Sequence, residues 1–250
     1  FDIGIAEQHA ITLAAGMASQ GLIPVVPIYS SFYQRAYDQV IHDVAIQNLP
    51  VVMCVDRAGI VGQDGETHQG LLDMAFFRIV PNLNILAPKD FKELEDMLEF
   101  AINLSKPVVL RYPRGGEDKD IKFEKHEKIE LGKAEILKEF DINEDKEKIT
   151  IIAIGKMVAK AVKLAKQYEE NGYNVQVINA RFIKPFDNDT IIKSLKISKQ
   201  VITLEDGTII NGLGTIVKEI IAENNIGIDI KTFAYPDQFI KHGTVDELES

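Results

Sequence analysis

The stretch LPVVMCVDRAGIVGQDGETHQG, residues 49–70, joins an uninterrupted apolar run to a loop rich in glycine and charged side chains. The run does not alternate between apolar and polar residues, which is typical of a strand covered on both faces, as in a parallel sheet. Loops and helix N-termini converge at the carboxyl ends of such strands and form ligand sites there. The stretch therefore predicts a parallel sheet and places a candidate site directly after one of its strands.

The segments on either side of this stretch alternate between apolar runs and helical patterns. Strands are predicted at residues 1–5, 22–29 and 106–113, and helices are predicted at residues 6–21, 32–47 and 89–104. Gly21 closes the first helical pattern, as expected of a residue just past a helix end. This alternation predicts an α/β domain with a mainly parallel sheet over residues 1–115.

The chain changes character after residue 115. Residues 116–148 are rich in charge and poor in apolar side chains, which predicts a linker with one or two edge strands. The alternation then resumes, so residues 149–250 are predicted to form a second α/β domain with a mainly parallel sheet. The last residues, TVDELES at 244–250, are expected to end the chain without a helix.

Composition narrows the kinds of partner. The formal net charge is -10, whereas nucleic acids and anionic membranes bind basic surfaces, so we expect small-molecule partners and neither of those. No apolar run is long enough to predict a membrane span. The single Cys54 excludes an internal disulfide. Because Phe1 is not methionine and residues 1–5 read as the inside of a strand, we expect the polypeptide to be a piece of a longer protein.

The loop after the apolar run holds the first candidate site. Arg57 offers a planar, bidentate grip on a phosphate or carboxylate, and His68 can donate or accept a proton near neutral pH. Asp64 can orient a hydroxyl or a neighbouring donor. Glycines at 59, 62, 65 and 70 permit tight turns or close approach of a ligand. The alternative is an ordinary surface loop, but the density of polar groups and glycines favours a functional one.

Two further loops carry candidates. Glu7 begins the first helical pattern and is either a functional carboxylate or a first-turn glutamate that complements the helix dipole. Arg111 and Arg114 follow the apolar run PVVL and either bind an anionic group or lie in a solvated loop. In the second domain, Glu205 is expected at the end of a strand, and both Glu205 and His242 are expected to have structural roles.

Together these loops carry a resemblance to a known family. The motifs are GIAEQH at 4–9, YSSFYQRAYDQ at 29–39, DRAGIVGQDGETHQG at 56–70, RYPRG at 111–115 and PDQFIKHG at 236–243. They resemble the 1-deoxy-D-xylulose-5-phosphate synthase family, thiamine-diphosphate enzymes related to transketolase, over nearly the whole chain. The resemblance implies a transketolase-like pyrimidine-binding domain without its first strand and helix, followed by a transketolase C-terminal domain.

The resemblance also implies roles for individual residues. Glu7 would act in catalysis by bonding a ring nitrogen of the cofactor's aminopyrimidine, and Phe32 would stack on that ring. Tyr29 would line the cofactor and substrate pockets, and Arg35 would brace the substrate pocket.

A second group would hold the substrates. Arg57, Asp64 and His68 would lie near them, with His68 steering proton transfers as a catalytic residue. Arg114 would join Arg57 on the phosphate of the acceptor, where two guanidinium groups match the anion.

The implied reaction joins pyruvate, with loss of carbon dioxide, to D-glyceraldehyde 3-phosphate and yields 1-deoxy-D-xylulose 5-phosphate, a precursor for isoprenoids, thiamine and pyridoxal. The implied cofactors are thiamine diphosphate and Mg²⁺. No GDG motif followed by an asparagine occurs in the sequence, so the domain that binds the diphosphate and the metal is expected outside this chain. The chain alone is expected to be inactive. The full-length protein is expected to be a homodimer in a bacterial cytoplasm, with a plastid-type organelle as the alternative location.

Two alternatives stay open. The first is the small subunit of a split transketolase or the beta subunit of a 2-oxoacid dehydrogenase, since both carry these two domains without a diphosphate domain. The second is a scaffold or regulatory module that kept the fold and lost the chemistry. Against the second, Glu7, Arg57, His68 and Arg114 all stand at the positions that the motifs require.

Overall fold

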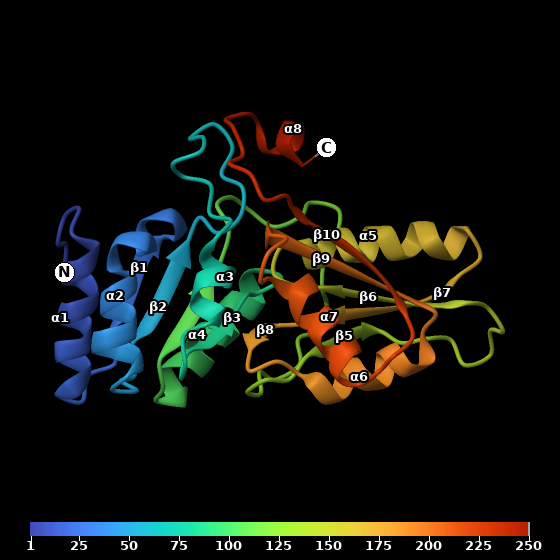
Figure 1. Ribbon diagram of the computed structural model, residues 1–250, viewed down its shortest axis with the longest axis horizontal. Helices are drawn as coiled ribbons and strands as arrows, with labels where there is room; N and C mark the ends of the chain where they lie inside the picture. Colours follow the sequence, from blue (N-terminus) through green and yellow to red (C-terminus); the bar gives the residue numbers. More distant parts are fainter. Residues whose placement is uncertain (250) are drawn as a thin grey trace.

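The computed structural model describes residues 1–249, and the apolar run at residues 49–56 lies at the heart of its first sheet (Figure 1). The run forms β2 (Val52–Asp56), whose first four residues are buried. The strand order is β1-β2-β4-β3-β8, and β1 (Val25–Tyr29), β2, β4 (Val108–Arg111) and β3 (Asn84–Leu86) are parallel. The predicted parallel sheet is therefore confirmed, with β2 buried between two parallel neighbours.

Helices pack on this sheet and complete the first lobe, by which we mean the four parallel strands β1 to β4 and these helices. They are α1 (Glu7–Ser19), the 3₁₀ helix η1 (Ser30–Ala36), α2 (Tyr37–Gln39), the π helix η2 (Val40–Ala45), α3 (Asp73–Arg78) and α4 (Phe91–Leu104). The helix predicted at residues 32–47 thus forms as three successive segments with different hydrogen-bond spacings. Tyr33, Val40 and Val44, which lie on these segments, are fully buried.

Residues 1–5 do not form the predicted strand, which is a correction to the sequence analysis. Gly4 adopts φ +64, and its N–H donates to the carboxylate of Asp2 at 2.9 Å. This local turn replaces a ladder, and Phe1 and Ile5 are left exposed. An apolar pattern five residues long does not distinguish such a segment from a strand.

A second sheet forms the second lobe. Its order is β10-β9-β6-β7-β5, built from β10 (Asp229–Tyr235), β9 (Gln200–Thr208), β6 (Lys148–Ala153), β7 (Asn174–Asn179) and β5 (Glu135–Lys138). All pairs are parallel except β5 on β7. Its helices are α5 (Met157–Glu170), α6 (Asn188–Ile197), α7 (Leu213–Glu223) and α8 (Val245–Leu248). Two mainly parallel α/β domains were predicted, and that fold class is confirmed.

Two local predictions in the second lobe are wrong. The end of the chain forms the short helix α8, because Thr244 and Glu247 make a capping box in which each side chain bonds the backbone of the other. Glu205 was expected at the end of a strand, but it lies inside β9, which continues to Thr208 through a pairing irregularity with β10.

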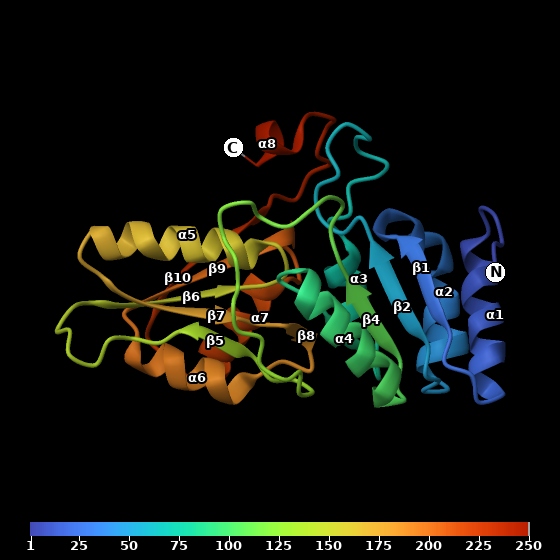
Figure 2. The same cartoon turned by 180° about the vertical axis from the view of Figure 1, so that it is seen from behind.

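The strand β8 (Phe182–Lys184) connects the two lobes. It follows β7 in the chain but pairs antiparallel with β3 at the edge of the first sheet. One hydrophobic cluster also runs through both lobes, from Ile11 to Ile220. Figure 2 shows the lobes side by side, with the loop after β2 and α8 at the same end of the molecule. The carboxyl end of the first sheet is therefore within reach of the second lobe.

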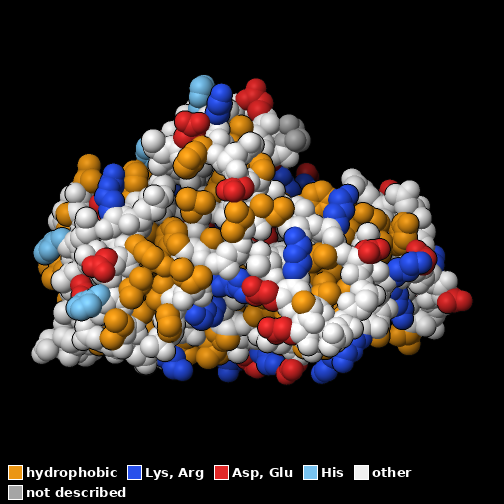
Figure 3. Space-filling view, in the orientation of Figure 1, with side chains coloured by type: hydrophobic (Ala, Val, Ile, Leu, Met, Phe, Trp, Pro, Cys, Tyr) orange, Lys and Arg blue, Asp and Glu red, His pale blue; other side chains and the backbone are white. Residues whose placement is uncertain are grey.

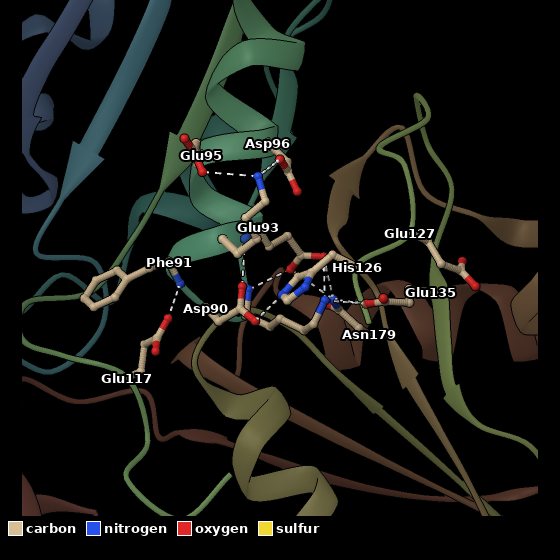
Figure 4. A network of polar contacts seen from close by, with 12 residues as sticks. Asp90, Phe91, Glu93, Glu95, Asp96, Glu117, His126, Glu127, Glu135 and Asn179 are labelled. Carbon is tan, nitrogen blue, oxygen red and sulfur yellow. Dashed lines mark hydrogen bonds and ion pairs between the residues drawn. The ribbon is translucent and has the colours of Figure 1, made fainter. Parts of the chain in front are cut away.

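A buried ionic cluster lies on the seam between the lobes (Figure 4). Lys89 donates to Glu93 at 3.2 Å and to Glu135 at 2.7 Å, and Arg181 donates to Glu93 at 2.7 Å. Asn179 bonds both carboxylates at 3.1 Å. Lys89 and Glu93 belong to the first lobe and the other three to the second, so the full set of pairs forms only when the lobes are docked.

Across residues 1–249, the structure contains no helix that combines the length and the apolar character needed to cross a membrane.

Candidate active site

Glu7 is the first residue of α1 and is only 7% exposed. The turn at Gly4 lies three residues before Glu7, so the chain turns just before α1 begins. Arg35, from η1, donates to the Glu7 carboxylate at 3.0 Å. The arginine side chain is half exposed, so it can hold the carboxylate in position without sealing it from a ligand. The structure thus presents Glu7 as an oriented carboxylate beside a helix N-terminus.

Aromatic and guanidinium groups extend this arrangement from Glu7 to the loop after β2. Tyr29 and Phe32 are stacked with ring centroids 5.5 Å apart and planes inclined by 11°. The Arg35 guanidinium carbon lies 4.9 Å from the centre of the Phe32 ring, and that of Arg57 lies 3.7 Å from the centre of the Tyr29 ring. The rings of His68 and Phe32 are in edge contact, with their centroids 5.2 Å apart. Five residues singled out from the sequence are therefore in one contiguous group.

An open groove of about 520 Å³ borders this group. Its lining includes Glu7, Tyr29 and Phe32, and the rest comes from residues 1–5 and from mainly apolar surface of α1 and β1. A carboxylate at the rim of an aromatic and apolar groove suits a flat heteroaromatic ring with a nitrogen that can hydrogen-bond the acid. The residues present therefore fit the aminopyrimidine ring of thiamine.

The loop at residues 57–70, called the site loop below, has a strained and closely packed base. Arg57 itself adopts φ 58, a left-handed conformation that costs a non-glycine residue on the order of 1 kcal/mol. The N–H groups of Gly59 and Gly70 each donate to the other's carbonyl at 2.7 Å. A Cβ on Gly70 would collide with the carbonyl oxygen of Arg57, so only glycine fits there. The base of the loop is thus fixed directly below Arg57.

Each arginine predicted to bind the acceptor phosphate already pairs with a carboxylate. Arg57 pairs with its neighbour Asp56, and Arg114 donates to Asp64 at 2.9 Å. The two loops begin side by side, because Ala58 donates its N–H to the carbonyl of Tyr112 at 3.0 Å. Arg114 and Asp64 are both about half exposed, so an anion that reaches Arg114 competes with Asp64 for it. His68 has a separate partner in the hydroxyl of Thr67 at 2.9 Å.

Arg111 is not available to a ligand and does not lie in a solvated loop, so neither of the two alternatives offered for it holds. It is 2% exposed, and it donates to Asp73 at 3.1 Å and to Asp206 at 2.6 Å. Burial raises the pKa of Asp73 in spite of Arg111. Burial alone would also raise the pKa of Asp206, but Arg111 and Lys156 hold it below its usual value. Arg111 therefore joins the lobes, with Asp206 supplied by β9.

Sequence reasoning missed two residues that shape the site. Asp206 packs directly against Gly59 at the base of the site loop, and Gln69 bonds the backbone near its tip at Val61 from Oε1 at 2.8 Å. The QG pair at 69–70 and the acidic pair at 205–206 were visible in the sequence. Only the fold brings residue 206 to residue 59, so no local pattern carries that contact.

No group of three or more His, Cys, Asp or Glu side chains that could hold a metal ion occurs within residues 1–249.

The fold and this groove define a chain of the transketolase type. The family described as "Transketolase, pyrimidine binding domain" matches residues 1–116, and "Transketolase, C-terminal domain" matches residues 138–250. The chain therefore belongs to the transketolase family, of which it carries these two domains.

Comparison with named proteins gives a narrower grouping. The chain is 48% identical over 248 residues to a 1-deoxy-D-xylulose-5-phosphate synthase of Clostridium tetani, and that match covers 99% of the chain and 39% of the relative. The chain is also 48% identical to a protein of the same name from Halothermothrix orenii, and that match covers 100% of the chain and 38% of the relative. The chain thus spans about two fifths of the length of these relatives.

Solved structures agree with this fold. The chain superposes on one described as "Split gene transketolase, inactive beta4 tetramer" with a TM-score of 0.84 and 29% identity, over 96% of this chain and 75% of that one. It superposes on transketolase from Campylobacter jejuni with a TM-score of 0.75 at 18% identity, over 99% of this chain and 36% of that one. The second likeness concerns the fold alone.

Proposed function

We propose that this chain is the part of a 1-deoxy-D-xylulose-5-phosphate synthase that binds the thiamine ring and the substrates. The observation that carries the proposal is the unbroken contact from Glu7 through Arg35, Phe32 and Tyr29 to Arg57. It joins a carboxylate suited to the cofactor with an arginine suited to a phosphate, and relatives 48% identical over the chain bear that name.

Thiamine diphosphate, when bound, supplies the electron sink that pyruvate decarboxylation requires. Glu7 donates a hydrogen bond to a ring nitrogen of the aminopyrimidine when protonated and accepts one back when ionised, so it moves a proton at that atom. Phe32 packs on the ring face, and Tyr29 keeps Phe32 in its orientation. The apolar wall of the groove excludes water from the face of the ring.

The substrates bind where the site loop meets the loop after β4. Arg57 and Arg114 hold the phosphate of D-glyceraldehyde 3-phosphate, and Asp64 keeps Arg114 oriented until the anion arrives. His68, at the edge of Phe32, lies between the ring site and the loop and exchanges protons with the reacting oxygen atoms. Arg35 braces the pocket through Glu7 and Phe32.

The remaining parts of the proposal concern the rest of the protein. We place the diphosphate and Mg²⁺ on the segment that the longer relatives have and these 250 residues do not contain. We propose a homodimer, since hydrophobic side chains gather on the first lobe in the face shown in Figure 3, and Leu72 and Ile79, which flank α3, are 44% and 66% exposed. The protein would act in a bacterial cytoplasm, or in a plastid-type organelle.

The test is product formation from pyruvate and D-glyceraldehyde 3-phosphate with thiamine diphosphate and Mg²⁺. This chain would be assayed alone and within a protein of the relatives' full length. We expect activity in the full-length form, and we expect Glu7→Gln to lower it by about a hundredfold or more, because a positioned acid is lost. The matched control is Glu223→Gln at the exposed end of α7. Full activity in Glu7→Gln would overturn the proposed role.

One alternative has its own support. The split transketolase has 29% identity and a TM-score of 0.84, and this chain covers 75% of its length. A transketolase would move a two-carbon unit from a ketose phosphate to an aldose phosphate and would not need pyruvate. Activity with a ketose donor and none with pyruvate would favour this alternative, and a folded full-length protein with neither activity would favour a scaffold.

A further inference from the structure

The last residues that the structure describes, 236–249, lie on the site loop rather than in the core of the second lobe. Figures 1 and 2 show α8 beside that loop from opposite sides. Most of these residues are exposed, and α8 has four residues, too few to be stable without contacts. We call residues 236–249 the tail strap. Because little apolar burial holds the strap, the few contacts at its two ends determine where it lies.

Gln69 forms the contact at the loop end of the strap. Its side-chain oxygen accepts from the N–H of Val61 at 2.8 Å and of Gly62 at 3.4 Å. Its side-chain nitrogen donates to the carbonyl of Gly62 at 3.4 Å and to that of Lys241 at 3.2 Å. Gln69 is 7% exposed, so these bonds have little competition from water. One buried amide therefore ties the tip of the site loop both to the base of the loop and to the strap.

Two glycines let the loop backbone rest directly on the strap. A Cβ on Gly62 would come within 3.0 Å of the carbonyl oxygen of Gly243, and Gly62 adopts φ +84. A Cβ on Gly65 would be 3.4 Å from the Cβ of His242, and Gly65 adopts φ +75. The contact with Gly65 gives His242 a packing role. The glycines of the site loop thus serve contact with the strap as well as turning of the chain.

Glu249 anchors the other end of the strap. Its carboxylate accepts from Lys156 at 2.7 Å and from Lys160 at 2.5 Å, at the beginning of α5. Its side chain is 13% exposed, so the pairs are partly shielded from solvent. α5 packs on β6 and β7 in the second sheet. The strap is therefore held between a rigid helix of the second lobe and the loop that carries the proposed substrate residues.

We propose that the tail strap positions the site loop for the phosphorylated acceptor, with Gln69 and Glu249 as positioning residues at its two ends. This inference rests on the proposed function. The base of the loop is fixed by the pairing of Gly59 with Gly70, and Asp64 and His68 lie between these two residues. Their placement depends on the tip, which the strap holds down. Loss of the strap leaves Arg57 in place and lets Asp64 and His68 move.

The test uses the full-length protein with Gln69→Glu, Glu249→Gln and the control Glu223→Gln. Gln69→Glu keeps an acceptor for Val61 but puts a carboxylate against the carbonyl of Lys241, while Glu249→Gln removes only the anchor on α5. Hydrogen exchange of peptides covering residues 59–69 would be compared with exchange of β6 and β9. We expect both strap variants to exchange about tenfold faster in the loop with unchanged exchange in the strands, and the control to match the wild type.

The kinetic readout separates positioning from general stability. We expect KM for D-glyceraldehyde 3-phosphate to rise about tenfold in both strap variants, with KM for pyruvate unchanged, because only the acceptor uses the loop tip. Unchanged loop exchange in Glu249→Gln would overturn the strap. Faster loop exchange with both KM values unchanged would overturn its positioning role. A wild-type protein without this activity would overturn the proposed function, while the exchange data still decide whether the strap holds the loop.

Discussion

At the scale of the residue, Glu205 is a buried carboxylate that serves a helix. It is 1% exposed, and its two oxygens accept from the N–H groups of Leu213 and Gly214, each at 2.8 Å. A side chain eight residues earlier thus caps the beginning of α7. A Cβ on Gly212 would collide with the Glu205 carboxylate, so glycine is required there. The structural role expected for Glu205 has a specific form, which is a helix cap supplied from inside a strand.

The titration of Glu205 predicts a pH dependence of stability. Burial raises its pKa from 4.5 to about 7 in the folded protein. The folded state therefore favours the protonated acid, and the stability this contributes is present below pH 4.5 and is lost as pH rises toward 7, on the order of 3 kcal/mol. Glu205→Gln should remove this slope. Urea unfolding at several pH values between 4.5 and 8 measures it, and an unchanged slope in the variant would contradict the assignment.

At the scale of the element, the site loop depends on glycine where the chain nearly touches itself. A Cβ on Gly70 would collide with the carbonyl oxygen of Arg57 and lie 2.9 Å from the Ser30 side chain. By contrast, a Cβ on Gly16, within α1, would meet nothing within 4 Å. The same substitution thus has opposite consequences at two positions of one lobe.

We therefore predict that Gly70→Ala lowers the free energy of unfolding by about 2 kcal/mol or more, since backbone must move. Gly16→Ala should raise it by about 0.5 to 1 kcal/mol, because alanine is the better helix former. Chemical unfolding of both variants gives the comparison. Equal effects of the two substitutions would mean that the close packing of the loop base does not exist in solution.

At the scale of the whole molecule, the two lobes share one hydrophobic cluster and one sheet. β8 completes the first sheet with residues of the second lobe, and Arg111 bridges Asp73 to Asp206 across the seam. Lys89 and Glu135 form a second buried ion pair between the lobes. Separating the lobes would break the pairs of Arg111 with Asp206 and of Lys89 with Glu135, and it would leave β3 without its antiparallel neighbour.

Two consequences can be measured at this scale. Calorimetry should show a single unfolding transition for this chain, and two resolved transitions would contradict a shared core.

Arg111→Met should lower the free energy of unfolding by about 3 to 5 kcal/mol, because Asp73 and Asp206 lose their buried partner. Arg114→Met removes an exposed arginine and should change stability by less than about 1 kcal/mol.

The sequence could predict the parts of the structure that local patterns encode. β2 follows from its apolar run, and the start of α1 follows from its helical pattern. The position of Arg57 just after a strand follows from the polar, glycine-rich loop that succeeds the apolar run. It could not predict that residues 182–184 join the first sheet, because that pairing links positions about a hundred residues apart in the chain. Asp206 was missed for the same reason, since its contact with Gly59 exists only once the lobes dock.

Arg111 and Arg114 show the limit at the site itself. They lie three residues apart and had the same alternatives in the sequence, yet one is buried against two carboxylates and the other is half exposed beside Asp64. The family resemblance assigned the phosphate to Arg57 and Arg114 and not to Arg111, and the burial of Arg111 is consistent with that choice. The roles assigned to individual site residues stay predictions until the variants are measured.

The strand β8 also sets where two homologous genes can be recombined. A chimaera joined in the charged segment between residues 116 and 138 would take its first sheet from one parent and the outermost strand of that sheet, Phe182–Lys184, from the other. Side chains at Ile85 and Leu86 would then face a strand that did not evolve with them. The first sheet and residues 182–184 should therefore come from the same parent. A chimaera that also takes residues 182–184 from the first parent should fold better than one that does not.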